Sequence, residues 1–326
     1  MKIAINGFGR IGRMTLRALQ NKPEVEVVAV NDLTDIKTLT HLLKYDTAHG
    51  RFPGEVDTDG DTMIVNGKRI LLLSEKDPEK LPWKDLDIDV VIESTGRFTD
   101  KAAAYSHINS GAKKVLITAP GSGGVKTIVH GVNNELIGDD VIYSTASCTT
   151  GSIAPILYIL DKEFGIESGY MITVHAFTAD QNLQDAPHKD LRRARAASHS
   201  IIPTTTGAAK AIGDVLPNLK GKMDGYSYRV PVIDASIVDL SINLKKEVSV
   251  NELNDLFKSY ADSSLKGVLE YTEEQFVSAD ILGNTHSSIV DGTLTKAIGK
   301  FVKVVAWYDN EVGISNRIAE LVTVLK

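Results

Sequence analysis

The only cysteine of the sequence lies in a stretch suited to nucleophilic chemistry. Cys148 stands among 326 residues between small hydroxyl side chains, Ser147 and Thr149. The following segment, 152–165, has the pattern of a helix that ends at a glycine. We therefore expect Cys148 at or near a helix N-terminus, where amides and the helix dipole favour a thiolate. Pro155 either kinks a helix that begins early or lies in the first turn of one that begins late.

His175 is the candidate base for this thiol. Residues 169–178 alternate like a strand, and His175 lies well inside it. Taken singly, a lone cysteine is more often a small buried apolar residue, and a strand histidine is more often a core residue. Together, a thiol loop and a following strand histidine are the pair that Cys–His catalysis requires.

A glycine-rich turn near the N-terminus predicts a dinucleotide site. Gly7, Gly9 and Gly12 follow a short apolar strand and open a helical segment, and Asp32 lies twenty residues beyond Gly12, after a second strand. This order of strand, glycine turn, helix, strand and acid is the dinucleotide fingerprint. Gly7 permits the turn, Gly9 lets the backbone approach a pyrophosphate, and Gly12 lets the helix pack on the strand. Asp32 would bind ribose hydroxyls and repel a 2′-phosphate, which favours NAD over NADP; the alternative is a Rossmann-like domain with another ligand.

Several cationic and hydroxyl side chains of the second half could form a phosphate site. A basic cluster spans 190–195, residues 204–207 open a helix-like run, and Arg229 is expected at the start of a strand. Arginine with serine, threonine and helix amides suits phosphate. The alternative is a solvated loop or a subunit contact, so this set depends on the fold bringing its members together.

The elements that would position these residues alternate between strands and helices. Asn66-Gly67 between two apolar runs predicts a hairpin, and 101–110 is predicted as one helix. The alternation indicates a parallel, doubly wound sheet, in which ligands bind at the carboxyl ends of strands. The residues at such ends are Asp32, Thr95 and Thr118.

Length and composition are those of a two-domain globular protein. The chain is long for one core, and its 43% hydrophobic content includes no membrane-length apolar run or signal peptide. One cysteine excludes an intramolecular disulfide and fits a reducing cytoplasm. A net charge of −6 gives no general attraction for nucleic acid or anionic lipid, and three arginines near 192–195 are a poor nucleic-acid site.

These motifs resemble those of the phosphorylating glyceraldehyde-3-phosphate dehydrogenase family over essentially the whole chain. The resemblance is carried by the segments 5–13, 146–150, 173–176, 190–195, 206–210, 229–231 and 307–311. It implies a doubly wound Rossmann NAD domain (1–147, completed by a C-terminal helix, 312–326) and an α+β catalytic and oligomerisation domain (148–311) with a mixed or antiparallel sheet. It also implies a cytoplasmic homotetramer in glycolysis, without a metal.

The resemblance assigns a role to each candidate residue. Cys148 would be the nucleophile and His175 its base. The residues implied for NAD are Gly7, Gly9, Arg10, Ile11, Gly12, Asp32, Lys76, Thr95, Thr118 and Asn310. Those implied for the phosphorylated aldehyde and inorganic phosphate are Ser147, Thr149, Thr178, Arg193, Thr206, Gly207 and Arg229.

Two other functions stay open on the sequence. The segment 198–200 is similar to that of erythrose-4-phosphate dehydrogenases, which use the same thiol and cofactor. A binding or adhesion protein that has lost catalysis is the alternative outside enzymes, and the intact Cys–His pair speaks against it. Ser152 stands where the family usually has a second cysteine, so no local disulfide is expected.

Overall fold

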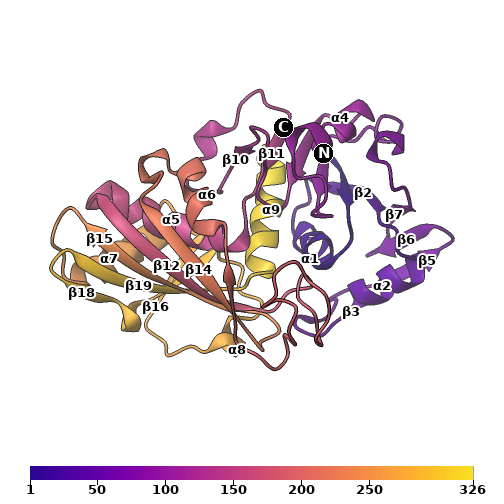
Figure 1. Cartoon of the computed structure of the whole chain (residues 1–326). Coiled ribbons are helices and arrows are strands. Elements are labelled where there is room, and N and C mark those ends of the chain that lie inside the picture. The colour runs from indigo at the N-terminus through magenta and orange to yellow at the C-terminus, as the bar shows by residue number, and fades with distance from the viewer. Residues whose placement is uncertain (326) are drawn as a thin grey trace. The chain divides into compact units, whose positions relative to one another are not determined.

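The computed structural model describes residues 1–325, which divide into two compact units. The first comprises 1–128, 134–146 and the residues from Ser315 onward; the second comprises 129–133 and 147–314. Each unit contains its own large sheet (Figure 1). Among the described residues, no helix combines the length and the apolar character needed to cross a membrane.

The first unit contains a nine-stranded sheet that is parallel except at one end. In spatial order its strands are β10 (Lys126–Thr127), β11 (Ile142–Ser144), β9 (Lys114–Ile117), β8 (Val90–Glu93), β1 (Lys2–Asn6), β2 (Glu26–Asn31), β7 (Lys68–Leu73), β6 (Thr62–Val65) and β5 (Val56–Asp59). The pairs β7–β6 and β6–β5 are antiparallel. The chain runs outward from β1 in both directions, so the predicted doubly wound sheet is confirmed.

Within residues 1–325, five α-helices or helical segments belong to this unit. They are α1 (Arg10–Leu19), α2 (Ile36–Lys44), α3 (Lys101–Ala104), α4 (Ser106–Asn109) and most of α9 (Val312–Val324), and a small ribbon joins β3 (Tyr45–Asp46) to β4 (Gly50–Arg51). The segment 101–110 is mostly helical, as predicted, but it breaks into two short helices at Tyr105. The predicted hairpin is confirmed: Asn66 and Gly67 both have positive φ, as a tight turn requires.

The core of the first unit includes a tryptophan beneath the sheet. Trp83 is fully buried and packs with apolar side chains from three strands and the loops beside them: Ala4, Ala29, Leu81, Ile88, Val91 and Ala112. Because an indole carries one N–H donor, its burial requires an acceptor inside the core.

The second unit contains a mixed sheet. Its strands lie in the order β13 (Ile202–Thr205), β14 (Met223–Val230), β12 (Ile166–Ala176), β15 (Ser236–Leu244), β19 (Phe301–Tyr308), β17 (Ser288–Asp291) and β16 (Leu269–Thr272), and β18 (Lys296–Ile298) pairs with β19. The helices are α5 (Cys148–Glu163), α6 (Ala208–Val215), α7 (Val250–Asp262) and α8 (Ser278–Ile281). Figure 1 shows β14, β12, β15 and β19 side by side. The predicted mixed sheet is confirmed.

Helix α5 begins at the cysteine. Its N-cap is Ser147, whose hydroxyl accepts a hydrogen bond from the amide of Thr150 at 3.1 Å. Of the two alternatives for Pro155, the early start is the one observed, since the proline lies inside α5. Gly165, with φ +71°, follows the helix, so the predicted end at a glycine is confirmed.

Candidate active site

The side chains of Cys148 and His175 meet in the second unit. Sγ of Cys148, in the first turn of α5, lies 3.5 Å from Nε2 of His175 on β12. The other ring nitrogen, Nδ1, lies 2.7 Å from the carbonyl oxygen of Ala176. In the tautomer in which Nδ1–H donates to that carbonyl, Nη1 of Arg229 donates to the same oxygen at 3.0 Å and not to Nδ1. Nε2 then carries a lone pair toward the sulfur and is the nitrogen able to accept the thiol proton.

Arg229 lies beside the imidazole on the adjacent strand. In the parallel register of β12 and β14, His175 pairs with Arg229, and Nη1 of Arg229 lies 2.9 Å from Nδ1 and 3.0 Å from the Ala176 carbonyl. The sequence-based placement of Arg229 at the start of a strand was wrong, because it is the penultimate residue of β14. Parallel pairing is what brings this strand end to the end of β12.

Burial and positive charge set the protonation of this pair. Burial, followed by Arg229 and Arg193, lowers the pKa of His175 to about 3, so the imidazole is neutral at physiological pH. Burial raises the pKa of the Cys148 thiol, and the Arg229 cation opposes that shift. Burial therefore opposes the thiolate that the helix N-terminus is expected to favour, whereas Arg229 supports it.

Tyr308 joins the helix of the cysteine to the strand of the histidine. Its hydroxyl lies 2.9 Å from the hydroxyls of both Thr149 and Thr173, and its ring meets the His175 ring edge-on at 5.8 Å. It is almost fully buried, and burial raises the pKa of its hydroxyl well above the ordinary value. The sequence analysis missed this residue, although a tyrosine at the end of a buried strand needs a polar partner for its hydroxyl.

A second cation, Arg193, lies near enough to act on the same groups. Burial, then the positive charge of Arg193, lowers the pKa of Arg229. Arg193 is held by Asp180 and by the Thr204 hydroxyl, which accepts from Nε at 2.9 Å. Two guanidinium groups that repel each other near His175 are an arrangement that an anion would stabilise.

The remaining predicted phosphate residues lie at element ends of the same unit. Thr178 follows β12 by two residues, and its amide donates to the side chain of Gln181 at 3.4 Å. Thr206 caps α6 by accepting from the Ala208 amide at 3.2 Å, and Gly207 is the N-cap residue. Ser147 and Thr149 flank the cysteine, with their hydroxyls bonded to Thr150 and Tyr308.

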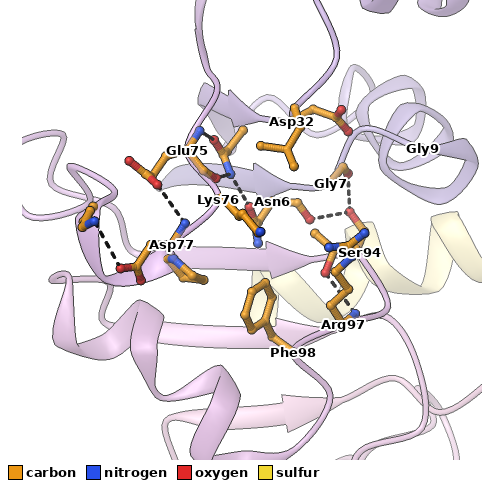
Figure 2. Close-up of a pocket in the computed structure, with 15 residues that line it drawn as sticks. Asn6, Gly7, Gly9, Asp32, Glu75, Lys76, Asp77, Ser94, Arg97 and Phe98 are labelled. Carbon is orange, nitrogen blue, oxygen red and sulfur yellow. Dashed lines mark hydrogen bonds and ion pairs between the residues drawn. The ribbon is translucent and has the colours of Figure 1, made fainter.

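The first unit contains a cavity of about 900 Å³ at the carboxyl ends of its central strands (Figure 2). Five of the predicted cofactor residues line it: Gly7, Gly9, Asp32, Lys76 and Thr95. Both oxygens of Asp32 accept from backbone amides, those of Phe8 at 2.8 Å and Thr34 at 2.9 Å, which fixes the carboxylate at the cavity wall.

The glycine turn of this cavity fits a dinucleotide phosphate. A Cβ added at Gly7 would lie 2.7 Å from the Thr95 amide nitrogen, and one at Gly12 would lie 2.2 Å from the Gly7 carbonyl, so both positions require glycine. At Gly9, an added Cβ would point into open space, which is the room that a pyrophosphate needs. No described side chain caps α1, so no side chain competes with an anion for its first amides.

Other predicted cofactor residues lie outside the lining of the cavity. Arg10, Ile11 and Gly12 form the first turn of α1, and the Arg10 guanidinium binds Asp46, which leaves its backbone amide as the group toward a phosphate. Thr118 follows β9, and its hydroxyl donates to the Glu93 carbonyl at 3.2 Å. Asn310 belongs to the second unit, where its amide oxygen accepts from the Ser236 hydroxyl at 2.7 Å.

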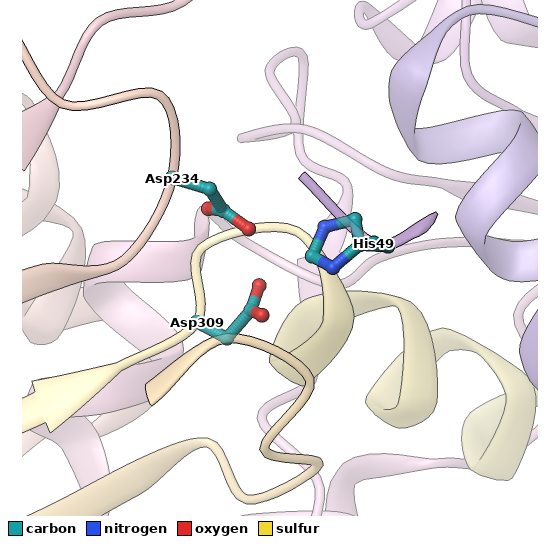
Figure 3. A group of neighbouring side chains, drawn as sticks. All are labelled: His49, Asp234 and Asp309. Atoms are coloured by element: carbon teal, nitrogen blue, oxygen red, sulfur yellow. The ribbon is translucent and has the colours of Figure 1, made fainter. Parts of the chain in front are cut away.

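A pair of buried carboxylates lies near Asn310 in the second unit. Asp234 and Asp309 are each 1% exposed, and Figure 3 shows both carboxylates pointing toward the same space. Asp309 accepts from the amides of Glu311 and Val312 with one oxygen and from Gly283 with the other. Burial, followed by the Asp234 charge, raises the pKa of Asp309 to about 7.

Fold and site together define a dinucleotide-binding oxidoreductase with a cysteine in its catalytic unit. Profiles of known families agree: that of the glyceraldehyde 3-phosphate dehydrogenase NAD binding domain matches residues 1–101, and that of the C-terminal domain of the same enzyme matches residues 147–310.

Curated proteins give the same result. The chain is 53% identical to glyceraldehyde-3-phosphate dehydrogenase 2 of Bacillus subtilis, over 99% of this chain and 96% of that protein. It is 53% identical to the enzyme of Geobacillus stearothermophilus (98% and 97%) and 54% identical to that of Mycobacterium tuberculosis (100% and 98%). The chain therefore belongs to the glyceraldehyde-3-phosphate dehydrogenase family. It is an NAD-dependent oxidoreductase of glycolysis.

Proposed function

We propose that the chain oxidises D-glyceraldehyde 3-phosphate and phosphorylates the product to 1,3-bisphosphoglycerate, with Cys148 as nucleophile and His175 as acid and base. The observation that carries this proposal is the 3.5 Å approach of Sγ to Nε2 beside the Arg229 guanidinium. The thiol proton passes to Nε2, the sulfur attacks the aldehyde carbon, and the imidazolium protonates the carbonyl oxygen, which yields a thiohemiacetal.

The same imidazole then acts as a base. NAD, when bound, supplies the acceptor for the hydride that leaves the former aldehyde carbon. His175 takes the hydroxyl proton as the carbonyl re-forms, and a thioester on Cys148 results. An oxygen of inorganic phosphate attacks this thioester, the C–S bond breaks, and the imidazolium returns a proton to the sulfur.

Anion binding near the thiol orients both substrates. Arg229 and Arg193 are the two cations whose charges act on His175, and we assign them, with Thr178, to the phosphates. Ser147, Thr149, Thr206 and Gly207 complete the proposed set with hydroxyls and amides. Holding a substrate by its phosphate serves orientation of the aldehyde as well as affinity. In the first unit, the cavity residues with Arg10, Ile11, Gly12 and Thr118 would hold NAD. The cofactor role expected for Asn310, in the second unit, stays a prediction.

The first experiment compares NADH formation from glyceraldehyde 3-phosphate and erythrose 4-phosphate, each with and without inorganic phosphate. The proposal requires faster turnover of the three-carbon aldehyde and dependence of its turnover on phosphate. Cys148→Ser should abolish acyl transfer while NAD binding stays measurable by calorimetry. Faster turnover of erythrose 4-phosphate, or turnover in the serine variant, would contradict the proposal.

We also propose that the protein is a cytoplasmic homotetramer. One face of the second sheet is covered by α5, whereas the side chains of opposite parity form a face that combines an ion pair, Lys303–Asp239, with apolar residues: Tyr170, Ile172, Val174, Ile237, Val305 and Trp307. Tyr170 is 64% exposed there. A second copy of the chain would cover this face. Light scattering measures the molar mass of the protein in solution. The unmodified protein should have the mass of four chains, and Ile237→Arg should lower that mass. A monomeric mass for the unmodified protein would refute the assembly.

A further inference from the structure

A buried chain of hydrogen bonds lies behind the wall of the cofactor cavity in the first unit. Nε1 of Trp83 donates to Nδ1 of His107 at 3.0 Å, and Nε2 of His107 lies 3.0 Å from Oε2 of Glu93. The side-chain amide of Asn6 donates to the same oxygen at 2.6 Å. These four side chains are at most 1% exposed, so their polar atoms depend on one another.

The indole fixes the tautomer of His107. Because an indole N–H can only donate, Nδ1 of His107 must accept, and the ring proton therefore resides on Nε2. Nε2–H then donates to Glu93, and the 3.4 Å approach of Nε2 to the Asn6 amide brings together two donors that share one acceptor.

Glu93 gathers donors from the cavity wall. Its other oxygen, Oε1, accepts from the Thr95 amide at 2.8 Å and from the Thr95 hydroxyl. Each named neighbour of the carboxyl group is a donor, which is the environment of an ionised carboxylate. The amide and hydroxyl protons of Thr95 are thereby committed to Glu93, and Thr95 can offer a cofactor only lone pairs and its methyl group.

The chain continues from Asn6 along the floor of the cavity. The side-chain oxygen of Asn6 accepts from the side-chain amide of Asn31 at 2.7 Å. The side chain of Asn31 in turn accepts from the backbone N–H of Glu75 at 2.8 Å and donates to its C=O at 2.9 Å. Asn6, Asn31, Glu75 and Thr95 all line the cavity, on segments far apart in the sequence (Figure 2). One hydrogen-bonded set therefore fixes four parts of the wall.

His107 also supports an apolar part of the same wall. The Phe98 ring, which lines the cavity, meets the His107 ring edge-on at 6.1 Å and 77°. Figure 2 shows Phe98 opposite Asp32 across the cavity. Loss of the imidazole would release the Glu93 carboxylate and the Phe98 ring together.

We propose that His107 is a positioning residue for NAD: its Trp83-imposed tautomer holds Glu93, which fixes Asn6 and Thr95 at the cofactor cavity. The inference rests on that cavity as the NAD site. His107 touches neither the cofactor nor the reacting atoms in this account. Its contribution is to preorganise the wall, so that NAD binding need not order these groups.

The test uses full-length protein with Trp307→Phe as the parent, so that Trp83 is the only tryptophan. His107→Phe keeps an aromatic ring and removes both hydrogen bonds, whereas His107→Gln offers a carbonyl to Trp83 and an N–H to Glu93. Calorimetry on the cofactor-free protein should show the NAD dissociation constant raised about tenfold in His107→Phe, since leaving buried polar groups unpaired costs about 1–3 kcal/mol. His107→Gln should stay within about twofold of the parent, a difference under 0.5 kcal/mol.

Trp83 emission supplies a readout that does not depend on the cofactor. His107→Phe should shift it to shorter wavelength because the indole loses its acceptor, and His107→Gln should restore the parent spectrum. Met63→Ala in β6 is the matched control, since it truncates a fully buried side chain outside the cavity lining. It should reduce stability and leave NAD affinity unchanged.

Three results would overturn the proposal: parental NAD affinity in a folded His107→Phe, equal losses in His107→Phe and His107→Gln, or an equal loss in Met63→Ala. If His107→Phe does not fold, Trp83→Phe in the natural chain replaces it and should also weaken NAD binding, and unchanged affinity there would refute the role. A different result would refute the proposed aldehyde oxidation: a parent protein that binds NAD but does not turn over the aldehyde.

Discussion

Nη1 of Arg229 lies 2.9 Å from Nδ1 of His175, across two parallel strands of the second sheet. This cation adds to burial in lowering the pKa of His175 to about 3, and it opposes the effect of burial on the Cys148 thiol. One arginine thus keeps the base unprotonated and favours the thiolate that the base would create. The same guanidinium is our candidate for the substrate phosphate, so charge at this position serves both binding and reactivity.

Replacing Arg229 by methionine should raise the pKa at which Cys148 reacts. The substitution removes the cation and keeps part of the apolar stem. The rate of alkylation by iodoacetamide, measured against pH in the cofactor-free protein, should shift to higher pH, with about tenfold slower reaction below the pKa for each pKa unit. Arg192→Met is the control, because Arg192 is exposed. Coincident profiles for Arg229→Met and the parent would remove Arg229 from this role.

His175→Asn should slow the chemical step and leave NAD binding intact. Loss of a general base typically lowers rates by about 10²–10⁴. Single-turnover formation of NADH at saturating substrates measures this step, and calorimetry with NAD checks the binding. An unchanged rate of NADH formation would show that Nε2, although 3.5 Å from the sulfur, does not take the proton.

Tyr308→Phe tests whether the hydroxyl sets the distance between thiol and base. The variant leaves the hydroxyls of Thr149 and Thr173 without their shared partner, and small displacements of reacting groups can cost about 10²-fold in rate. We expect kcat to fall about ten- to a hundredfold with little change in the KM for NAD. Tyr105→Phe, at an exposed tyrosine of the first unit, should have no effect. A parental kcat in Tyr308→Phe would limit the hydroxyl to a packing role.

Asp234→Asn should stabilise the protein at alkaline pH. The pKa of Asp309 is raised to about 7 by burial and then by the Asp234 charge, whereas an unfolded aspartate ionises near 3.9. The folded state therefore holds the extra proton between about pH 4 and 7, and this contribution to stability is lost as the pH rises through 7. Removing the Asp234 charge lowers the pKa of Asp309 and recovers about 1–2 kcal/mol at pH 8.

The midpoint of urea unfolding at pH 5 and pH 8 measures this effect. The gain of Asp234→Asn over the parent should be large at pH 8 and small at pH 5. Asp262→Asn, at an exposed position, is the control for the loss of one negative charge. An equal gain in stability at pH 5 and pH 8 would mean that the charge of Asp234 does not affect the ionisation of Asp309.

Local signals in the sequence were enough to predict the glycine turn, the Asn66-Gly67 hairpin and the helix that ends at Gly165. Each depends on a backbone conformation that a few neighbouring residues determine. The contact of Arg229 with His175 could not be predicted, because it depends on which strands pair and in which direction. The effect of burial on the pKa of Cys148 was also out of reach, since it depends on the residues that the fold packs around the sulfur.

The partners of the buried polar side chains behind the sites could not be predicted from the hydrophobic pattern of the sequence either. Glu93 and His107 lie in segments whose periodicity indicates only that they are buried. A charged residue at the end of an apolar strand signals that a buried partner exists, but the partner is identified only by the fold. Tyr308 is the same case in the second unit.

Cys148 is the single thiol of the chain, and Ser152 occupies the position one helical turn further along α5. Peroxide oxidation of Sγ would yield a sulfenic acid with no resolving cysteine in the same molecule, so its repair must come from a thiol supplied by another molecule. Because the chain has one thiol, thiol labelling with a maleimide measures the reactivity of Cys148 alone.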